Sequence, residues 1–161
     1  MPTTLPVPID FSLPEGWLPA SAPAGVAYAA VHPQADAGFA ANITVDGGLP
    51  REGVTAVELA DASVERLREF AESVTVTSRR ELGSDSAPAL AQRIAFSALA
   101  GDMRQDFVQS QVYLFLTDDV DPRKRALIRL ALTSTAAQYD SVLVDFQDFV
   151  RTVRPSAVAG V

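Results

Sequence analysis

The sequence predicts an α+β fold, with a single antiparallel β-sheet of about six to seven strands flanked by α-helices. Three observations predict it: short segments with alternating or β-branched apolar residues recur, Pro, Gly and Asp turns separate them, and two segments have helical apolar spacing. The 161 residues suit one domain, with a core over about residues 8–155 and flexible termini.

The stretch DFSLPEGW, residues 10–17, opens the predicted fold. Phe11 and Leu13 alternate as in a first strand, the Pro-Glu-Gly that follows forms a turn, and Trp17 packs against the sheet beside it. A buried indole N–H requires a hydrogen-bond acceptor, so we expect Trp17 to have one.

Two strands are expected next, at residues 26–32 and 39–46, with a turn containing Pro33 and Gly38 between them. The second strand alternates between an apolar face and a polar face. Its apolar face carries Phe39, Ala41, Ile43 and Val45.

A helix is expected to begin at the capping box formed by Thr55 and Glu58 and to end near Ser73. Its buried stripe is formed by Val57, Ala60, Val64, Leu67 and Ala71. The β-branched segment at residues 74–82 then suits a strand.

Three longer strands are expected at residues 88–98, 103–116 and 123–134. The core face is predicted to carry Val108, Ser110, Val112, Leu114 and Leu116, beside Ala126, Ile128, Leu130 and Leu132. A three-residue loop at 100–102 would add Leu90, Ile94 and Phe96 to that face, although a slip of one residue exchanges the two faces.

The last element is a helix that begins at the capping box of Thr135 and Gln138 and is stopped by Pro155. Its apolar positions follow helical spacing: Val142, Leu143, Phe146, Phe149, Val150 and Val153.

The opposite face of the long strands is the candidate binding surface, because it mixes arginines, amides and aromatic rings. Arginine and aromatic residues are enriched at protein interfaces. The candidate partner-binding residues are Arg93, Gln109, Gln111, Tyr113, Phe115 and Arg129. In the alternative interpretation, the C-terminal helix packs across this face and leaves only a polar rim.

Catalytic and metal-binding chemistry finds little support in the sequence. Cysteine is absent, and the single histidine, His32, precedes a proline with no G-x-S-x-G elbow elsewhere. The acidic segment 118–122 lacks calcium-loop spacing, and carboxylate pairs such as Asp145 with Asp148 suit solvated helix faces. We therefore expect no catalytic residue, no metal and no cofactor.

The charge and the hydropathy of the sequence limit the classes of partner that we expect the chain to bind. The net charge of −7 disfavours nucleic acids and anionic membranes. The N-terminus has no signal-peptide pattern, and no apolar run is long enough to span a membrane. We expect a cytoplasmic protein, with export through a signal-independent system as the open alternative.

The order of several motifs resembles the PsbP-like fold, which includes the DcrB-like group, LpqN-type lipoproteins and Eag chaperones of type VI secretion. The motifs are F-x-L-P-E-G-W, F-A-A-N-I-T-V, Q-S-Q-V-Y-L-F-L, A-L-I-R-L-A-L-T-S-T and F-x-x-F-V-R-T-V-R-P. The resemblance implies an antiparallel sheet flanked by helices, no catalytic residues and a binding role. The chain departs from LpqN-type proteins because it has no lipobox cysteine.

The leading functional hypothesis is a non-enzymatic protein-binding module, an adaptor or chaperone of a bacterial secretion-type system, acting as a monomer or a homodimer. The alternative is a carrier of a small ligand or lipid, with an apolar cavity between sheet and helix. An exposed apolar surface favours a protein partner, whereas an enclosed pocket favours a ligand.

Overall fold

The computed structural model describes residues 9–84, 87–100, 102–117 and 125–155. The expected flexible termini, the acidic segment 118–122 and the first two residues of the basic segment 123–125 lie outside this range. The elements are β1 (Ile9–Asp10), β2 (Leu18–Ala20), β3 (Tyr28–Val31), β4 (Asn42–Gly48), α1 (Ala56–Phe70), β5 (Glu72–Gly83), β6 (Pro88–Ala100), β7 (Met103–Thr117), β8 (Arg125–Thr135), α2 (Tyr139–Thr152) and β9 (Arg154–Pro155).

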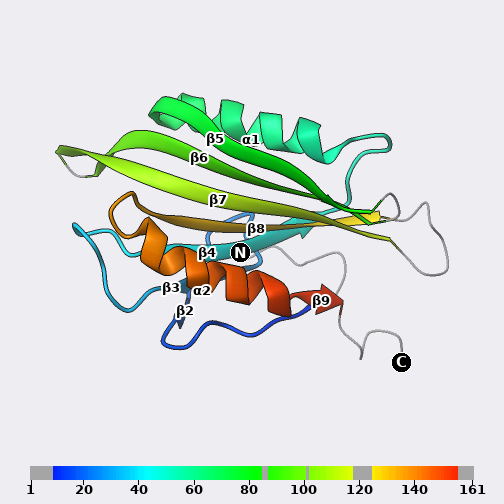
Figure 1. Ribbon diagram of the computed structural model, residues 1–161, viewed down its shortest axis with the longest axis horizontal. Coiled ribbons are helices and arrows are strands. Elements are labelled where there is room, and N and C mark those ends of the chain that lie inside the picture. Colours follow the sequence, from blue (N-terminus) through cyan, green and yellow to red (C-terminus); the bar gives the residue numbers. More distant parts are fainter. Residues whose placement is uncertain (1–8, 85–86, 101, 118–124, 156–161) are drawn as a thin grey trace.

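Seven strands form one antiparallel sheet in the order β2-β3-β4-β8-β7-β6-β5. The predicted α+β class is therefore confirmed. The two helices lie on opposite faces of the sheet and over different halves of it (Figure 1). Helix α1 packs on β5 and β6, whereas α2 packs on β8. Strands β1 and β9 pair separately, which ties the two ends of the described chain together.

The larger core lies between α2 and the middle of the sheet. Val142, Phe146 and Phe149 are buried on α2 at helical spacing, as predicted. They pack in one cluster with strand residues that include Ile43 and Leu130. The alternation predicted for residues 39–46 is confirmed for Ala41, Ile43 and Val45, which are fully buried, but Phe39 lies outside β4, is half-buried and packs against Phe107.

The N-terminal segment contributes Trp17 to this core. Trp17 is buried, and its indole Nε1 donates a hydrogen bond to Oδ2 of Asp145 at 3.0 Å. The predicted turn is present, because Trp17 N–H donates to the Pro14 carbonyl across Gly16, which has a φ of +88°. The predicted strand through Phe11 is wrong: β1 ends at Asp10, and Phe11 packs against Phe149 with ring centroids 5.3 Å apart.

The start of α1 agrees with the sequence, whereas its end and the start of α2 differ: α1 ends at Phe70, and the predicted end, Ser73, lies in β5. Oγ1 of Thr55 accepts the Glu58 N–H at 3.2 Å, which confirms Thr55 as the N-cap of α1. Helix α2 begins only at Tyr139, so Thr135 is not its N-cap, although Oγ1 of Thr135 accepts the Gln138 N–H at 3.3 Å as the predicted capping box requires. Thr135 belongs to β8, and its hydroxyl donates to Asp36.

The register between β6 and β7 corrects the predicted faces. Ala100 pairs with Met103, so two residues join the strands instead of three. Because the side-chain period of a strand is two, this difference moves every β6 residue to the other face. Leu90 consequently lies beside Tyr113, and Arg93 lies beside Ser110. The predicted pairing of β7 with β8 is confirmed, with Val112 opposite Leu130.

Candidate functional site

The sheet face that the sequence favoured for binding lies largely beneath α1. The side chains of Gln111, Tyr113 and Phe115 are 0%, 1% and 2% exposed. Tyr113 and Phe115 pack in a second core cluster with Ala56 and Ala60 of α1. The prediction that another element covers this face is correct, but the covering element is α1 and not the C-terminal helix.

A hydrogen-bonded chain of polar side chains crosses four strands on this face. Nε and Nη2 of Arg79 donate to Oε1 of Gln92 at 3.0 and 2.8 Å, and Nε2 of Gln92 donates to Oε1 of Gln111 at 2.7 Å. Gln111 donates in turn to Gln109, whose Nε2 donates to Oγ1 of Thr133 at 2.9 Å. Buried polar groups of this kind must be paired, and these are.

Tyr113 joins this chain to α1. Its hydroxyl donates to Oε1 of Gln111 at 3.1 Å and lies 2.6 Å from Oγ of Ser63. Because a phenol has one hydrogen, Ser63 is the donor in the second bond. Tyr113, which was predicted to meet a partner, therefore bonds to α1, and Gln111 is joined to α1 through it.

Arg129 lies at the edge of the surface covered by α1. Its Nη1 is 3.5 Å from Oδ2 of Asp46, and both side chains are 22% exposed. Its guanidinium lies 6.0 Å from the centre of the Tyr113 ring. Burial raises the pKa of the Asp46 carboxyl above its ordinary value, against the opposing influence of Arg129 and Arg66.

Arg93 is separated from the other candidates by the corrected register and faces the α2 side of the sheet. Its guanidinium lies over the Tyr139 ring, 5.0 Å from the ring centre. Its Nε is buried with no hydrogen-bond partner in the described structure. This cation is held in place by an aromatic ring, and part of its hydrogen-bonding capacity is unused.

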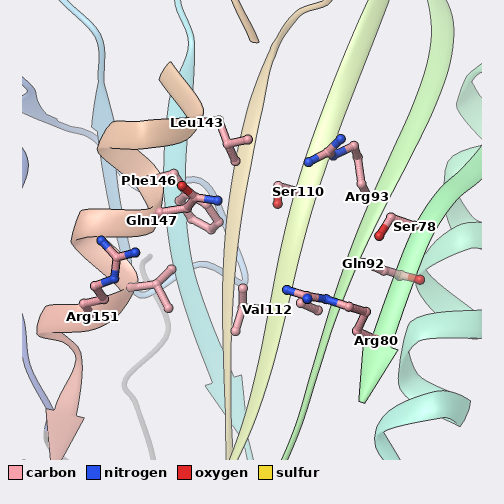
Figure 2. Close-up of a pocket in the computed structure, with 12 residues that line it drawn as sticks. Ser78, Arg80, Gln92, Arg93, Ser110, Val112, Leu143, Phe146, Gln147 and Arg151 are labelled. Atoms are coloured by element: carbon pink, nitrogen blue, oxygen red, sulfur yellow. The ribbon is translucent and has the colours of Figure 1, made fainter. Parts of the chain in front are cut away.

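A groove of about 270 Å³ runs along α2 on this side of the sheet (Figure 2). Its lining combines apolar side chains with arginines: Ser78, Arg80, Ala91, Gln92, Arg93, Ser110, Val112, Leu143, Phe146, Gln147, Val150 and Arg151. The α2 residues recur at positions 143, 147, 150 and 151, which is one stripe beside the buried stripe of that helix.

The groove carries three arginines and no carboxylate among its described lining residues, in a chain whose net charge is −7. Arg151 is paired with Asp148 of the same helix at 2.9 Å. Arg80 is exposed and has no ion pair or hydrogen bond within the described structure. Figure 2 shows Arg80 and Arg93 reaching from β5 and β6 toward the groove.

Of the residues that line this groove, only Arg93 is among the binding candidates that the sequence predicts. The sequence predicts Arg80 only as part of a strand, and it predicts Leu143 and Val150 as core positions; both pack against the larger core and also line the groove. The alternation of Ser78 and Arg80 places both on one face of β5 and is visible in the sequence. The corrected register and the position of α2 were needed to bring this face and the α2 stripe together.

The residues considered for catalysis are not brought together. His32 lies at the end of β3, where Nδ1 is hydrogen-bonded within its own turn to Gln34, and its ring contacts Trp17. Asp36 accepts from Thr135 instead of approaching His32. Among the described residues, no group of three or more His, Cys, Asp or Glu side chains could hold a metal ion.

The topology and the groove first define a class: an α+β protein with a seven-stranded antiparallel sheet, one helix on each face and an open groove on one side. Comparison with solved structures identifies the particular fold. LpqN of Mycobacterium tuberculosis, described as involved in cell envelope biogenesis, matches with a TM-score of 0.66 at 10% identity, over 93% of this chain and 86% of LpqN. The chain therefore has the PsbP-like fold that its motifs predicted.

Two further structures support this fold. The Ran-binding protein Mog1p of Saccharomyces cerevisiae matches with a TM-score of 0.61 at 14% identity, over 91% of this chain and 89% of that one. CyanoP, the PsbP of Synechocystis sp. PCC 6803, matches with a TM-score of 0.59 at 15% identity, over 92% and 86%.

Comparisons with protein-family models and with curated protein sequences found no match. Within the described residues, no helix is both long enough and apolar enough to cross a membrane.

Proposed function

We propose that this chain is a non-enzymatic protein-binding module that holds a segment of a partner protein in the groove beside α2. The observation that carries the proposal is that α2 covers only part of its face of the sheet. On the α2 side, β8 lies under the helix and Val112 of β7 is buried in the same core cluster, whereas no described helix covers β5 and β6 (Figure 1). Ala91, Leu143 and Val150 are half-buried and present apolar surface there, and Arg80 and Arg93 present charge.

The geometry supports a protein partner over the alternative of a small-ligand carrier. The groove, at about 270 Å³, is smaller than ligand pockets, which are about 300–1,000 Å³ and enclose most of their ligand. It runs along the side of α2 and is not enclosed between α2 and the sheet. A surface of this kind suits a segment that rests on it and continues beyond it.

The proposal places binding on the sheet face opposite most of the sequence candidates. A partner can reach Gln111, Tyr113 and Phe115 only if α1 leaves the sheet. We propose that these three residues support the fold beneath α1 and that Arg93 contacts the partner. Gln109 and Arg129 would meet a partner only at the margin of α1.

The resemblance to Eag chaperones supports the finer proposal of a cytoplasmic adaptor or chaperone of a bacterial secretion-type system. Mog1p, with the same fold, is described as Ran-binding, which is a protein-binding role. Fractionation of the native host, together with the identity of the captured partner, tests this assignment.

Site-specific photo-crosslinking tests the binding site. A photoreactive residue at Gln147, an exposed groove position on α2, is expected to trap a protein partner in native lysate. The same residue at Glu69, exposed on α1, serves as the control. Equal adducts at both positions, or an adduct at Glu69 alone, would show that the groove is not the site.

A further inference from the structure

We propose that the partner segment in the groove is an acidic amphipathic helix. Its carboxylates pair with Arg80 and Arg93, and its apolar stripe packs on Ala91, Leu143 and Val150. This inference rests on the proposed function and adds the chemistry and the conformation of the bound segment.

The charge of the segment follows from the arginines. Arg80 pairs across the strands with Ala91, and Arg93 is two residues further along β6, so the two cations are diagonal neighbours on one face. Like charges at that spacing repel, and the described groove lining contains no carboxylate to separate them. A planar guanidinium binds a carboxylate through two parallel hydrogen bonds, so carboxylates satisfy both arginines.

The helical conformation follows from the backbone of the sheet. The backbone groups of β6 and β7 are engaged in ladders with the strands on either side, so the face of the sheet presents side chains only. An extended segment lying on that face would bury backbone N–H and C=O groups with no partner. A helix satisfies these groups internally and can therefore cover the face without that cost.

The width of the uncovered surface also suits one helix. Strands lie about 4.8 Å apart, so β5 and β7 are separated by about 10 Å. A helix with its side chains is about 10–12 Å across and packs about 8–10 Å from a neighbouring helix. A partner helix beside α2 would therefore occupy the surface between α2 and the β5 edge, and the small side chains of Ala91 and Ser110 would allow it to approach closely.

Selection from a peptide library tests the inference without knowledge of the natural partner. The probe is a phage-displayed library of 20-residue peptides, selected on the full chain. We expect enrichment of Asp or Glu flanking an apolar stripe with i, i+3, i+4 and i+7 spacing, and a bound peptide that is helical by NMR. Arg80→Glu should weaken binding about tenfold or more, as expected for lost charged hydrogen bonds.

Arg51→Glu is the matched control, because Arg51 is also exposed, has no ion pair in the described structure, and undergoes the same change of charge. It should leave binding unchanged. Equal loss in the two variants would overturn the inference, as would selected peptides that bind in the groove but are acid-poor or extended.

Binding of oleate and of inorganic phosphate tests whether the groove arginines bind an anion other than a peptide carboxylate. Oleate binding that Arg80→Glu abolishes, with no groove peptide selected, would overturn the helix in favour of an anionic amphiphile. Acid-poor peptides that protect the groove overturn this inference and leave the proposed function standing. Absence of both groove peptides and a crosslink at Gln147 overturns both.

Discussion

Arg93 of β6 pairs with Ser110 of β7, and this pairing places the arginine on the side of the sheet that α2 only partly covers. Gln111, the next residue along β7, faces the opposite side and is fully buried beneath α1. Two adjacent positions of one strand thus separate an open groove from a closed polar network.

Tyr113→Phe is expected to destabilise the fold while leaving partner binding unchanged. The substitution removes the hydroxyl that joins Ser63 to Gln111 and leaves the Ser63 hydroxyl without its acceptor. We expect the free energy of unfolding in urea to fall by about 1–2 kcal/mol, the usual effect of losing a buried hydrogen bond. Tyr28→Phe, at a half-buried ring with no hydroxyl bond in the described structure, should change it by less than about 0.5 kcal/mol.

The double variant Tyr113→Ala and Arg129→Ala distinguishes the two faces by binding. If the residues beneath α1 only support the fold, the folded fraction of the double variant should capture the partner as well as the wild type does. Thermal unfolding establishes the folded fraction, and capture is compared at equal folded concentration. Loss of capture at full folding would return the site to the face that the sequence favoured.

The hydrogen bond between Trp17 and Asp145 should contribute measurably to stability. Asp145→Ala leaves the buried indole N–H without its acceptor, and bonds to charged groups contribute about 1.5–3 kcal/mol. Asp148→Ala is the control, because its exposed pair with Arg151 should contribute less than about 1 kcal/mol. Unfolding followed by the fluorescence of the single tryptophan reports both variants, and equal effects would contradict this role of Asp145.

Acidification should raise the free energy of unfolding of the wild type relative to that of Asp46→Asn. Burial raises the pKa of Asp46 in the folded state above its unfolded value, so the folded protein binds the proton more tightly. The contribution of this group to stability is therefore present below the unfolded pKa and is lost as pH rises through the folded pKa. Urea unfolding between pH 7 and about pH 4 should show that the free energy of unfolding of the wild type increases relative to that of the variant as pH falls. A change in the opposite direction would contradict the effect of burial.

The elements of the fold could be predicted because each has a local signal. The capping box at Thr55, the alternation through Ile43 and the helical spacing of Phe146 are all short-range patterns, and the structure contains each element they predict. The start of α2 was missed because Thr135 and Gln138 match a capping box while the chain is still completing β8 and a turn.

The site could not be predicted because it depends on long-range pairing. A difference of one residue between β6 and β7 reverses the face of Arg93, and both faces of β7 are apolar enough to serve as a core. No local pattern indicates which helix covers which half of the sheet. The groove exists because α1 and α2 cover different halves, which is a property of the assembled fold.

Capture of the partner by Ser110→Trp and Thr44→Trp tests the groove most directly. Both replace a small, half-buried strand residue with a bulky ring, Ser110 in the groove and Thr44 on β4 on the other face. After thermal unfolding has shown that both variants fold, Ser110→Trp is predicted to lose at least about nine-tenths of the captured partner, whereas Thr44→Trp retains it. Equal capture by the two variants, or loss only in Thr44→Trp, would contradict the assignment of partner binding to the groove beside α2.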